Sequence, residues 1–474
     1  MKERDIVGYL PDDKPTLGKS IVFALQQFLV MLPATVLAAI IMNGFGLELY
    51  SIPAAILASG IATITFLLVT NFKIPLYYGS SFSYIGAVAI VVTYGVDNLA
   101  SSSTVLGSVL IASVLSGLMS IGAGLLIRYF GKDKIDKVLP GHITGMIAMI
   151  IGLVLSENVM NGILNTGPNG VDWLSVLVSM VTFLTIAIMT VILKKGFVSQ
   201  IPILIGVIVG VVVSYMVWVP SLGSSWSFNN LSVYFDGIMN TQTVSMLDVM
   251  PWVTIPAAFQ LPELIGVALI AIFPIAFATI PESAAHVNQI DLYVNNLSNQ
   301  KDGKDYKIRE MLDTNLIGDG IGDIVAVLSG GPAGTNYGEN VSASAVTKNF
   351  SSYVFLITGI LAIIVGLLLE VLNLGNLSLI LTNPVVQGVS LYLFGAIAVQ
   401  GIALMIEKKV DIFDSKVVAV MAFIGIVGLG VDSIPVTSSF VLPGIGVAAL
   451  GGILLNICLN FLDKKAKSKD QPRA

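Results

Sequence analysis

The sequence contains very little charge for its length. Only 11% of its 474 residues are Asp, Glu, Lys or Arg, whereas a soluble globular chain averages about 25%. Hydrophobic residues make up 55% of the chain, and the mean hydropathy is +0.89. A composition this poor in charge excludes a soluble globular domain and predicts a polytopic membrane protein.

Cysteine and histidine are also scarce. The single cysteine, Cys458, lies in the last apolar segment, which excludes an internal disulfide. With His142 and His286 as the only histidines, the chain has no Cys/His cluster and no nucleophile–base set. We therefore expect no catalytic residues, no metal and no cofactor, and an intramembrane enzyme is disfavoured. The start of the chain is polar and charged, so no signal peptide is expected.

Apolar stretches long enough to cross a bilayer recur along the chain. A transmembrane helix needs about 20 apolar residues, and on this measure we expect about fourteen spans. The segments 75–95 and 331–347 are the weakest, because Gly, Ser, Thr and Asn interrupt them. The expected spans are 20–42, 51–70, 75–95, 103–127, 139–156, 173–193, 198–219, 264–286, 313–329, 331–347, 352–372, 379–405, 413–431 and 441–462.

The Lys and Arg residues fall in alternate loops. If the N-terminus is cytoplasmic and both weak segments cross, all 24 cations lie on the cytoplasmic side. The other loops contain Asp and Glu but no cation, and this includes the longest loop, 220–263. Because this distribution follows the positive-inside rule, we predict a multi-pass protein of the cell membrane with both termini cytoplasmic. The N-terminal segment 1–18 and the basic tail 463–474 would then lie in the cytoplasm.

The two weak segments resemble each other. Residues 74–90 read IPLYYGSSFSYIGAVAI and residues 331–347 read GPAGTNYGENVSASAVT, so a Tyr-Gly pair occupies the same place in each. Each is the third span of a set of seven, and an odd number of spans inverts the second set in the membrane. Proline and glycine predict an extended lead-in and then a half-helix that begins near the midplane, with free N–H groups facing a ligand. The alternative is two glycine-rich packing helices.

Several polar residues are expected inside the membrane. Glu282 and His286 are four residues apart and so share one helix face, which indicates proton coupling or a polar substrate contact. An interfacial His286 that only pairs with Glu282 is the alternative. Gln26 and Gln27 are expected to form interhelical hydrogen bonds, and one of them is a candidate for reaching the site.

Three aspartates flank or enter the ninth expected span. Asp313 is interpreted as a helix cap at its cytoplasmic end. Asp319 and Asp323 share a helix face and are expected to tether this span to its neighbours. His142, beside Pro140 near the start of the fifth span, is interpreted as an interfacial residue.

These motifs resemble those of the nucleobase/ascorbate transporter family, which includes xanthine and uracil permeases. The resemblance rests on YYGSSFSYI, on ESAAH in the eighth span and on GGPAGTNYGENV in the tenth, and it is strongest to bacterial uracil permeases. Similarity extends over nearly the whole chain, from LQQFLVMLPATVL to GVSLYLFGAIAVQG.

The resemblance implies an all-α polytopic membrane protein with fourteen spans in two inverted seven-span repeats. Short antiparallel β-strands would open spans three and ten. The core domain would comprise 19–133 and 263–373, and the gate domain 134–262 and 374–462. This organisation permits a homodimer through the gate domain.

The resemblance also implies roles for site residues. Glu282 and Glu339 would hold a base with help from the backbone at Phe82 and Gly338, and His286 would tune or share the proton of Glu282. Further candidates for supporting the site are Ser81, Tyr337, Asn340 and Gln26. This chain departs from the family at Ser283, Ala284 and Ser342, where histidine, glycine and glycine are usual.

The expected function is secondary active import of a nucleobase by proton symport, with alternating access between core and gate. Purine-type relatives tend to carry glutamine where Glu339 stands, so uracil is favoured over xanthine or uric acid. The chemistry agrees, because two carboxylates can accept the N–H groups of a planar base while a half-helix donates to its carbonyls. An anion transporter of the same architecture and a channel are the alternatives; two carboxylates disfavour the first, and an alternating-access repeat disfavours the second.

Overall fold

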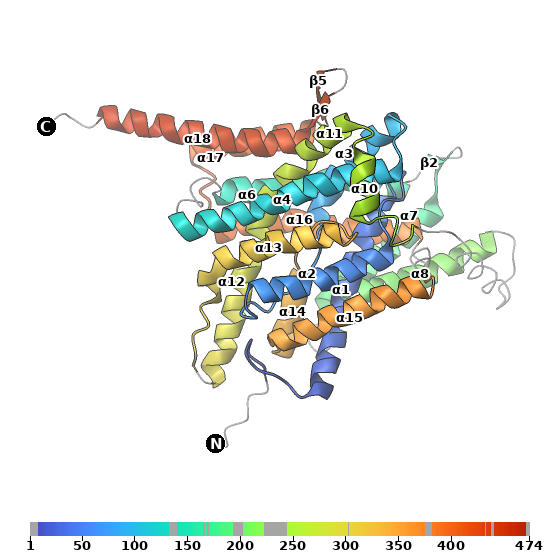
Figure 1. The fold of residues 1–474 in the computed structure, drawn as a ribbon. Coiled ribbons are helices and arrows are strands. Elements are labelled where there is room, and N and C mark those ends of the chain that lie inside the picture. Colours follow the sequence, from blue (N-terminus) through green and yellow to red (C-terminus); the bar gives the residue numbers. More distant parts are fainter. Residues whose placement is uncertain are drawn as a thin grey trace.

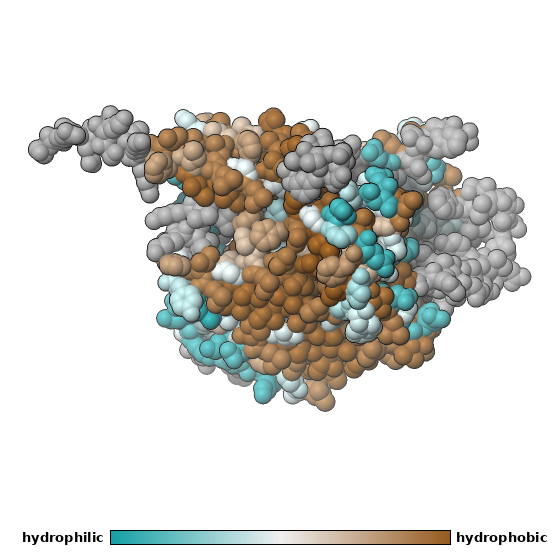
Figure 2. Space-filling view, turned by 45° about the horizontal axis from the view of Figure 1, so that its top comes forward, coloured by the Kyte–Doolittle hydropathy of each residue, from teal (hydrophilic) through white to brown (hydrophobic). Residues whose placement is uncertain are grey.

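The computed structural model describes residues 8–131, 140–164, 166–167, 170–192, 202–221, 244–301, 303–374, 382–431, 433–437 and 440–470. These residues form mostly helices, and many of them run between the same two ends of the molecule (Figure 1). Figure 2 shows a broad apolar surface, with hydrophilic residues gathered toward its left and right ends. An apolar band between two polar ends is the surface that a bilayer requires.

Within the described ranges, eight helices are long and apolar enough to cross a membrane. They are α1 (Leu17–Asn43), α2 (Ile52–Val69), α4 (Ser102–Phe130), α6 (Gly141–Leu164), α7 (Trp173–Ile192), α15 (Ser352–Val371), α16 (Asn383–Glu407) and α18 (Gly444–Asp470). A ninth arises if α10 (Pro251–Ala258) and the helical segment Pro262–Ile275, bent by 109°, form one broken span. The expected total of about fourteen stays a prediction.

The remaining helices are not among these eight. They are α3 (Ile85–Asp97), α8 (Pro202–Ser221), α11 (Pro262–Ile272), α12 (Ala276–Lys301), α13 (Leu312–Leu328), α14 (Gly338–Thr347) and α17 (Ser415–Gly430). The expected span 264–286 is divided, because a 3-10 turn at Phe273–Ile275 that contains Pro274 separates α11 from α12. Proline removes a backbone donor and so breaks the helical ladder there.

Local sequence explains where several helices begin. Ser51 accepts a hydrogen bond from the backbone N–H of Ala54 at the start of α2, and Ser101 does the same for Thr104 in α4. The expectation that Asp313 caps the helix is wrong. Asp313 lies inside the first turn of α13, and its carboxylate forms a salt bridge with Arg128 Nε of α4 at 2.7 Å instead of capping the helix.

Small residues allow close helix packing. A Cβ added to Gly320 of α13 would lie 2.2 Å from the carbonyl oxygen of Gly117 in α4, so these two backbones touch. Gly60 of α2 meets the carbonyl oxygen of Gly359 in α15 in the same way, with a hypothetical Cβ at 2.4 Å. Inside a bilayer the hydrophobic effect does not drive helices together, because lipid tails are as apolar as the helix surfaces. Close packing at small residues therefore contributes to their association.

Three two-stranded sheets are present in the described residues. β1 (Tyr78–Ser80) pairs antiparallel with β4 (Gly334–Asn336), so segments more than 250 residues apart in sequence meet. The other two sheets join neighbours, β2 (Thr166–Gly167) with β3 (Gly170–Val171) and β5 (Ser433–Thr437) with β6 (Phe440–Pro443). A 3-10 turn at Phe82–Tyr84 follows β1 and leads into α3.

The N-terminal residues 8–13 form a strap across the ends of α12 and α14. The backbone N–H of Tyr9 donates to the carbonyl of Lys348, and that of Phe350 donates to the carbonyl of Tyr9, both at 2.8 Å. Leu10 is buried in a cluster that includes Leu297 and Phe350. Residues 8–13 are therefore held in place by hydrogen bonds and by the burial of Leu10.

Candidate functional site

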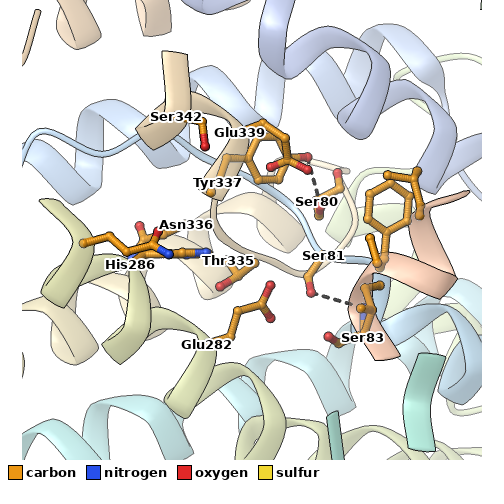
Figure 3. A pocket seen from close by; sticks show the side chains of 16 residues that line it. Ser80, Ser81, Ser83, Glu282, His286, Thr335, Asn336, Tyr337, Glu339 and Ser342 are labelled. Carbon is orange, nitrogen blue, oxygen red and sulfur yellow. Dashed lines mark hydrogen bonds between the residues drawn. The ribbon is translucent and has the colours of Figure 1, made fainter. Parts of the chain in front are cut away.

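A cavity of about 240 Å³ lies where the β1–β4 pair meets α12, α14 and α16 (Figure 3). Sites for drug-sized ligands are about 300–1,000 Å³, so this cavity suits a smaller molecule. Its walls are Ser80, Ser81, Phe82, Ser83, Glu282, His286, Gln289, Thr335, Asn336, Tyr337, Gly338, Glu339, Ser342, Leu393, Ala396 and Ile397.

The paired strands bring two helix starts to this cavity. Pairing extends beyond the strands, because the backbone N–H of Tyr337 donates to Tyr77 and that of Ser81 donates to Ala333. α14 then begins at Gly338 with no side-chain cap on its first turn. Uncapped N–H groups at a helix start carry partial positive charge and are suited to bind a carbonyl or an anion.

Glycine permits the close approach of these segments. A Cβ on Gly79 would lie 2.5 Å from the ring of Tyr337, and a Cβ on Gly338 would lie 2.8 Å from His286 Nε2. Neither position has room for a side chain unless its neighbour moves. The Tyr-Gly pair seen twice in the sequence therefore has a steric reason in both segments.

Two carboxylates face the cavity from different helices. Glu282 and His286 lie one turn apart on α12, and Glu339 lies in the first turn of α14. Figure 3 shows Glu282 and Glu339 on opposite sides of the cavity, with His286 beside them. Among the described residues neither carboxylate forms a salt bridge, and the cavity lining includes no Lys or Arg. Both carboxylates are therefore open to a ligand that donates hydrogen bonds.

The structure brings most of the expected site residues together, but not all. Those that line the cavity are Glu282, Glu339, Phe82, Gly338, His286, Ser81 and Tyr337. Asn340 points away from it, because its side-chain amide donates to Gln27 Oε1 at 2.7 Å. Gln26 is buried but lies outside the cavity. Its neighbour Gln27 is the glutamine that contacts α14.

Other lining residues were missed by the sequence analysis. Gln289 follows Glu282 by seven residues and Ser342 follows Glu339 by three, so helical periodicity alone could have indicated both. The apolar wall of Leu393, Ala396 and Ile397 on α16 gives no such signal, because these residue types also face lipid.

A buried polar network supports the strands from behind. Asp323 of α13 accepts hydrogen bonds from the backbone N–H of Gly334 at 2.6 Å and from the hydroxyl of Tyr84 at 3.0 Å. It therefore tethers α13 to both strand segments, as expected. Asp319 is buried on the same helix, but one of its carboxylate oxygens has no partner.

Ser283, one of the departures from the family pattern, has a place in this network. Its hydroxyl oxygen accepts from Asn315 Nδ2 at 2.6 Å and from Asn336 Nδ2 at 3.0 Å. It therefore joins α12 to α13 and β4, next in sequence to Glu282. His142 is buried near the start of α6 and does not line the cavity.

Comparison with known proteins places this architecture in a family. A family model described as a permease family matches residues 18–437. The uracil permease of Bacillus caldolyticus is 30% identical over 454 residues, which cover 94% of this chain and 93% of the relative.

Two solved structures share the fold. The transmembrane domain of the cyanobacterial bicarbonate transporter BicA matches with a TM-score of 0.52 at 13% identity, over 93% of this chain and 98% of that one. The murine anion transporter Slc26a9, in an inward-facing state, matches with a TM-score of 0.58 at 11% identity, over 98% and 74%. At these identities the likeness concerns the fold alone. The match over most of its length shows that this chain belongs to the family of xanthine and uracil permeases, which are multi-pass membrane transporters and not enzymes.

Proposed function

We propose that this chain imports a nucleobase, uracil, across the cell membrane by proton symport. The observation that carries the proposal is the convergence of Glu282 and Glu339 on one small cavity whose described lining contains no Lys or Arg. Uracil presents two N–H donors and two carbonyl acceptors in one plane, which complements two carboxylates and the N–H groups of a helix start. The name of the Bacillus caldolyticus relative, a uracil permease, supports this substrate.

The roles of the site residues follow from their positions. Glu282 and Glu339 accept the N–H groups of the base, and the backbone at Phe82 and Gly338 donates to its carbonyls. Ser81 and Tyr337 complete the polar wall between them. Charge-assisted hydrogen bonds are stronger than neutral ones, so the ionised carboxylate of Glu339 contributes most to the affinity. Glu282 accepts an N–H of the base through its carbonyl oxygen while it holds the coupled proton.

Proton coupling is assigned to the pair on α12. A neutral base brings no charge, so its accumulation needs a coupled ion. Glu282 is an intramembrane carboxylate in direct reach of the cavity, and His286 follows it by one turn on the same face. Glu282 therefore binds both the base and the proton, and His286 modulates that proton.

The transport cycle is proposed to alternate between two domains. The core, 19–133 and 263–373, contributes the strands, α12 and α14, and the gate, 134–262 and 374–462, contributes α16. The cavity lies between these groups, and the rings of Phe82 and Phe394 meet across them at 6.4 Å between centroids. The antiparallel β1–β4 pair supports two inverted repeats of seven spans each.

Membrane orientation and assembly complete the proposal. Gln289 and Ser342 are exposed where they line the cavity, on the stretches of α12 and α14 that lead to Lys301 and to Lys348 respectively. With both termini cytoplasmic, this side of the cavity faces the cytoplasm. A homodimer through the gate domain is compatible with this arrangement.

Two alternatives remain to be compared with this proposal. A permease for xanthine or uric acid would use the same site, but Glu339 favours a pyrimidine by resemblance. A small-anion transporter shares the fold, as the names of BicA and Slc26a9 indicate. Two carboxylates facing a cavity whose described lining contains no Lys or Arg disfavour an anion.

Uptake into proteoliposomes tests the proposal. Labelled uracil, xanthine and uric acid would be offered at two external pH values, with and without a sodium gradient. We expect uracil to accumulate with an inward proton gradient alone. Accumulation that follows sodium and not protons contradicts the coupling, and accumulation of xanthine or uric acid without uracil contradicts the substrate.

A further inference from the structure

Helix α1 contributes no residue to the cavity lining. It nevertheless contacts the segment that carries Glu339 at two places. One contact is made by Gln27 and the other by Thr35, eight residues further along α1. The two contacts lie on either side of Glu339 in sequence.

In the first contact, the side-chain amide of Gln27 both accepts and donates a hydrogen bond. Asn340 Nδ2 donates to Gln27 Oε1 at 2.7 Å and to the Gln27 backbone carbonyl at 2.9 Å. Gln27 Nε2 donates to Ser344 Oγ at 2.9 Å. Gln27 is 1% exposed, and Asn340 and Ser344 are fully buried. Water therefore does not compete for these hydrogen bonds, and losing them leaves buried polar groups unsatisfied.

The second contact fixes the start of the helix. The hydroxyl of Tyr337 lies 3.0 Å from Thr35 Oγ1 and donates to the carbonyl of Ser80 at 2.9 Å. The ring of Tyr337 also packs directly against Gly79. The residue that precedes α14 is thus held by α1 and by β1 together.

The geometry of a short helix makes these contacts decisive for Glu339. α14 has ten residues, and helices shorter than about 12–15 residues are marginal on their own. Its rotation about its axis is therefore set by neighbours. Asn340 and Ser344 are one turn apart and mark one face, and successive residues of an α-helix differ by about 100°. The hydrogen bonds of Gln27 hold that face against α1, and the side chain of Glu339 then points toward the cavity.

We propose that Gln27 is a positioning residue that sets nucleobase affinity through Glu339. This inference rests on the proposed function, because it concerns the same binding site. Gln27 does not touch the ligand. It holds α14 at the rotation in which the carboxylate of Glu339 meets the base.

A double-mutant cycle tests this coupling. Uracil affinity would be measured by calorimetry for the wild type, Gln27→Leu, Glu339→Gln and the double variant. We expect Gln27→Leu alone to weaken uracil binding about tenfold, because a misplaced Glu339 carboxylate loses its charge-assisted hydrogen bond to the base. In the Glu339→Gln background the same change should have little further effect. Equal losses in both backgrounds would overturn the proposal, since they indicate a general effect on folding.

Two further variants distinguish the proposed effect on Glu339 from a general loss of folding. Ser344→Ala removes only one partner of Gln27 and should give a smaller loss in the same direction. Thr358→Val is the matched control. It removes a fully buried hydroxyl that donates to the Val354 carbonyl at 2.9 Å and lies 3.5 Å from the Ala24 carbonyl of α1, and that forms no hydrogen bond with α14 among the described residues. Its uracil affinity should stay at the wild-type value, and a loss equal to that of Gln27→Leu contradicts the proposal.

A measurement without ligand separates this inference from the proposed function. Because Cys458 is the only cysteine, Glu339→Cys in a Cys458→Ser background carries one thiol, at the cavity. Its reaction with a charged thiol reagent should slow when Gln27→Leu is added and should not change with Thr358→Val. An unchanged rate with Gln27→Leu overturns the inference. If the wild type binds no nucleobase but this rate slows, the proposed function fails and the positioning role stands.

Discussion

The two strand segments at the cavity have the same layout but different chemistry. After β1 the chain makes a 3-10 turn at Phe82–Tyr84 and only then enters α3, and Ser81 uses its own hydroxyl to accept the N–H of Ser83. After β4 the chain enters α14 at once, with Glu339 in the first turn and no side-chain cap. One segment therefore presents an aromatic ring and a partly satisfied backbone, whereas the other presents a carboxylate at a helix start that has no side-chain cap.

We propose that this difference divides the contacts with a ligand between the two segments. The antiparallel pairing fixes where both segments lie, and the residues that follow each Tyr-Gly pair, Phe82 in one and Glu339 in the other, decide what each segment presents to the cavity. A ligand between them would meet an apolar face on one side and a hydrogen-bond acceptor on the other. Planar heterocycles with polar edges suit such a site.

Breaking the shared framework should have the largest effect. At Gly334 an added Cβ would lie 2.3 Å from the backbone carbonyl oxygen of Gly79, which cannot rotate away. Gly334→Ala should therefore separate the strands, reduce the free energy of unfolding by about 1–3 kcal/mol or more, and abolish uptake. Thermal unfolding in detergent and uptake in proteoliposomes would measure both.

The control for that variant is Gly266→Ala on α11, where an added Cβ meets nothing within 4 Å. It should keep the wild-type melting temperature and uptake. If Gly334→Ala behaves like this control, the two strands are not held in the described register.

Separating binding from coupling should have the next largest effect. Glu282 faces the α14 carboxylate from α12, and we assign the proton to it. Glu282→Gln keeps an acceptor for the base but cannot release a proton, so accumulation driven by a pH gradient should be lost while equilibrium exchange of uracil persists. Accumulation at the wild-type level would show that the coupled proton resides elsewhere.

Removing the charge from the α14 segment should weaken binding without abolishing it. A hydrogen bond to a charged group contributes roughly 1.5–3 kcal/mol, against about 1 kcal/mol for a neutral one. Glu339→Gln should thus weaken uracil binding about tenfold, and Glu339→Ala should lose more. Xanthine should be affected less than uracil. Wild-type uracil affinity in a folded Glu339→Gln protein, measured by calorimetry, would show that Glu339 only packs.

Changing the aromatic side of the comparison should have the smallest effect. Phe82→Leu keeps an apolar wall but removes the edge-to-face contact with Phe394, and such aromatic pairs contribute about 0.5–1.5 kcal/mol. We expect a change in uracil affinity of a few-fold at most. A loss larger than that of Glu339→Gln would reverse the proposed division between the two segments.

Much of this site could be predicted from short sequence signals. The repeated Tyr-Gly pair and the nearby prolines and glycines predicted two extended lead-ins followed by helices, because those residues restrict or free the backbone in recognisable ways. Glu282 and His286 were found because charge inside an apolar segment is costly and helical spacing puts them on one face.

The remainder depended on three-dimensional packing. Gln26 and Gln27 are adjacent and chemically identical, so only the rotation of α1 decides which one contacts Asn340. The cation partner of Asp313 lies on another helix, 185 residues away in sequence. Leu393, Ala396 and Ile397 of α16 line the cavity, but the same residue types also commonly face lipid. Periodicity within one segment carries no information about such partners.

The N-terminal strap has a practical consequence for anyone who expresses this protein. Leu10 lies in one buried cluster with Leu297 and Phe350, and nearby Asp12 forms a salt bridge with the exposed Lys304. A chain shortened past Asp13 would leave that apolar patch bare at the water-facing end, where chaperones and proteases recognise exposed apolar surface. Affinity handles and fluorescent reporters are therefore better joined after the end of α18, with the first thirteen residues kept.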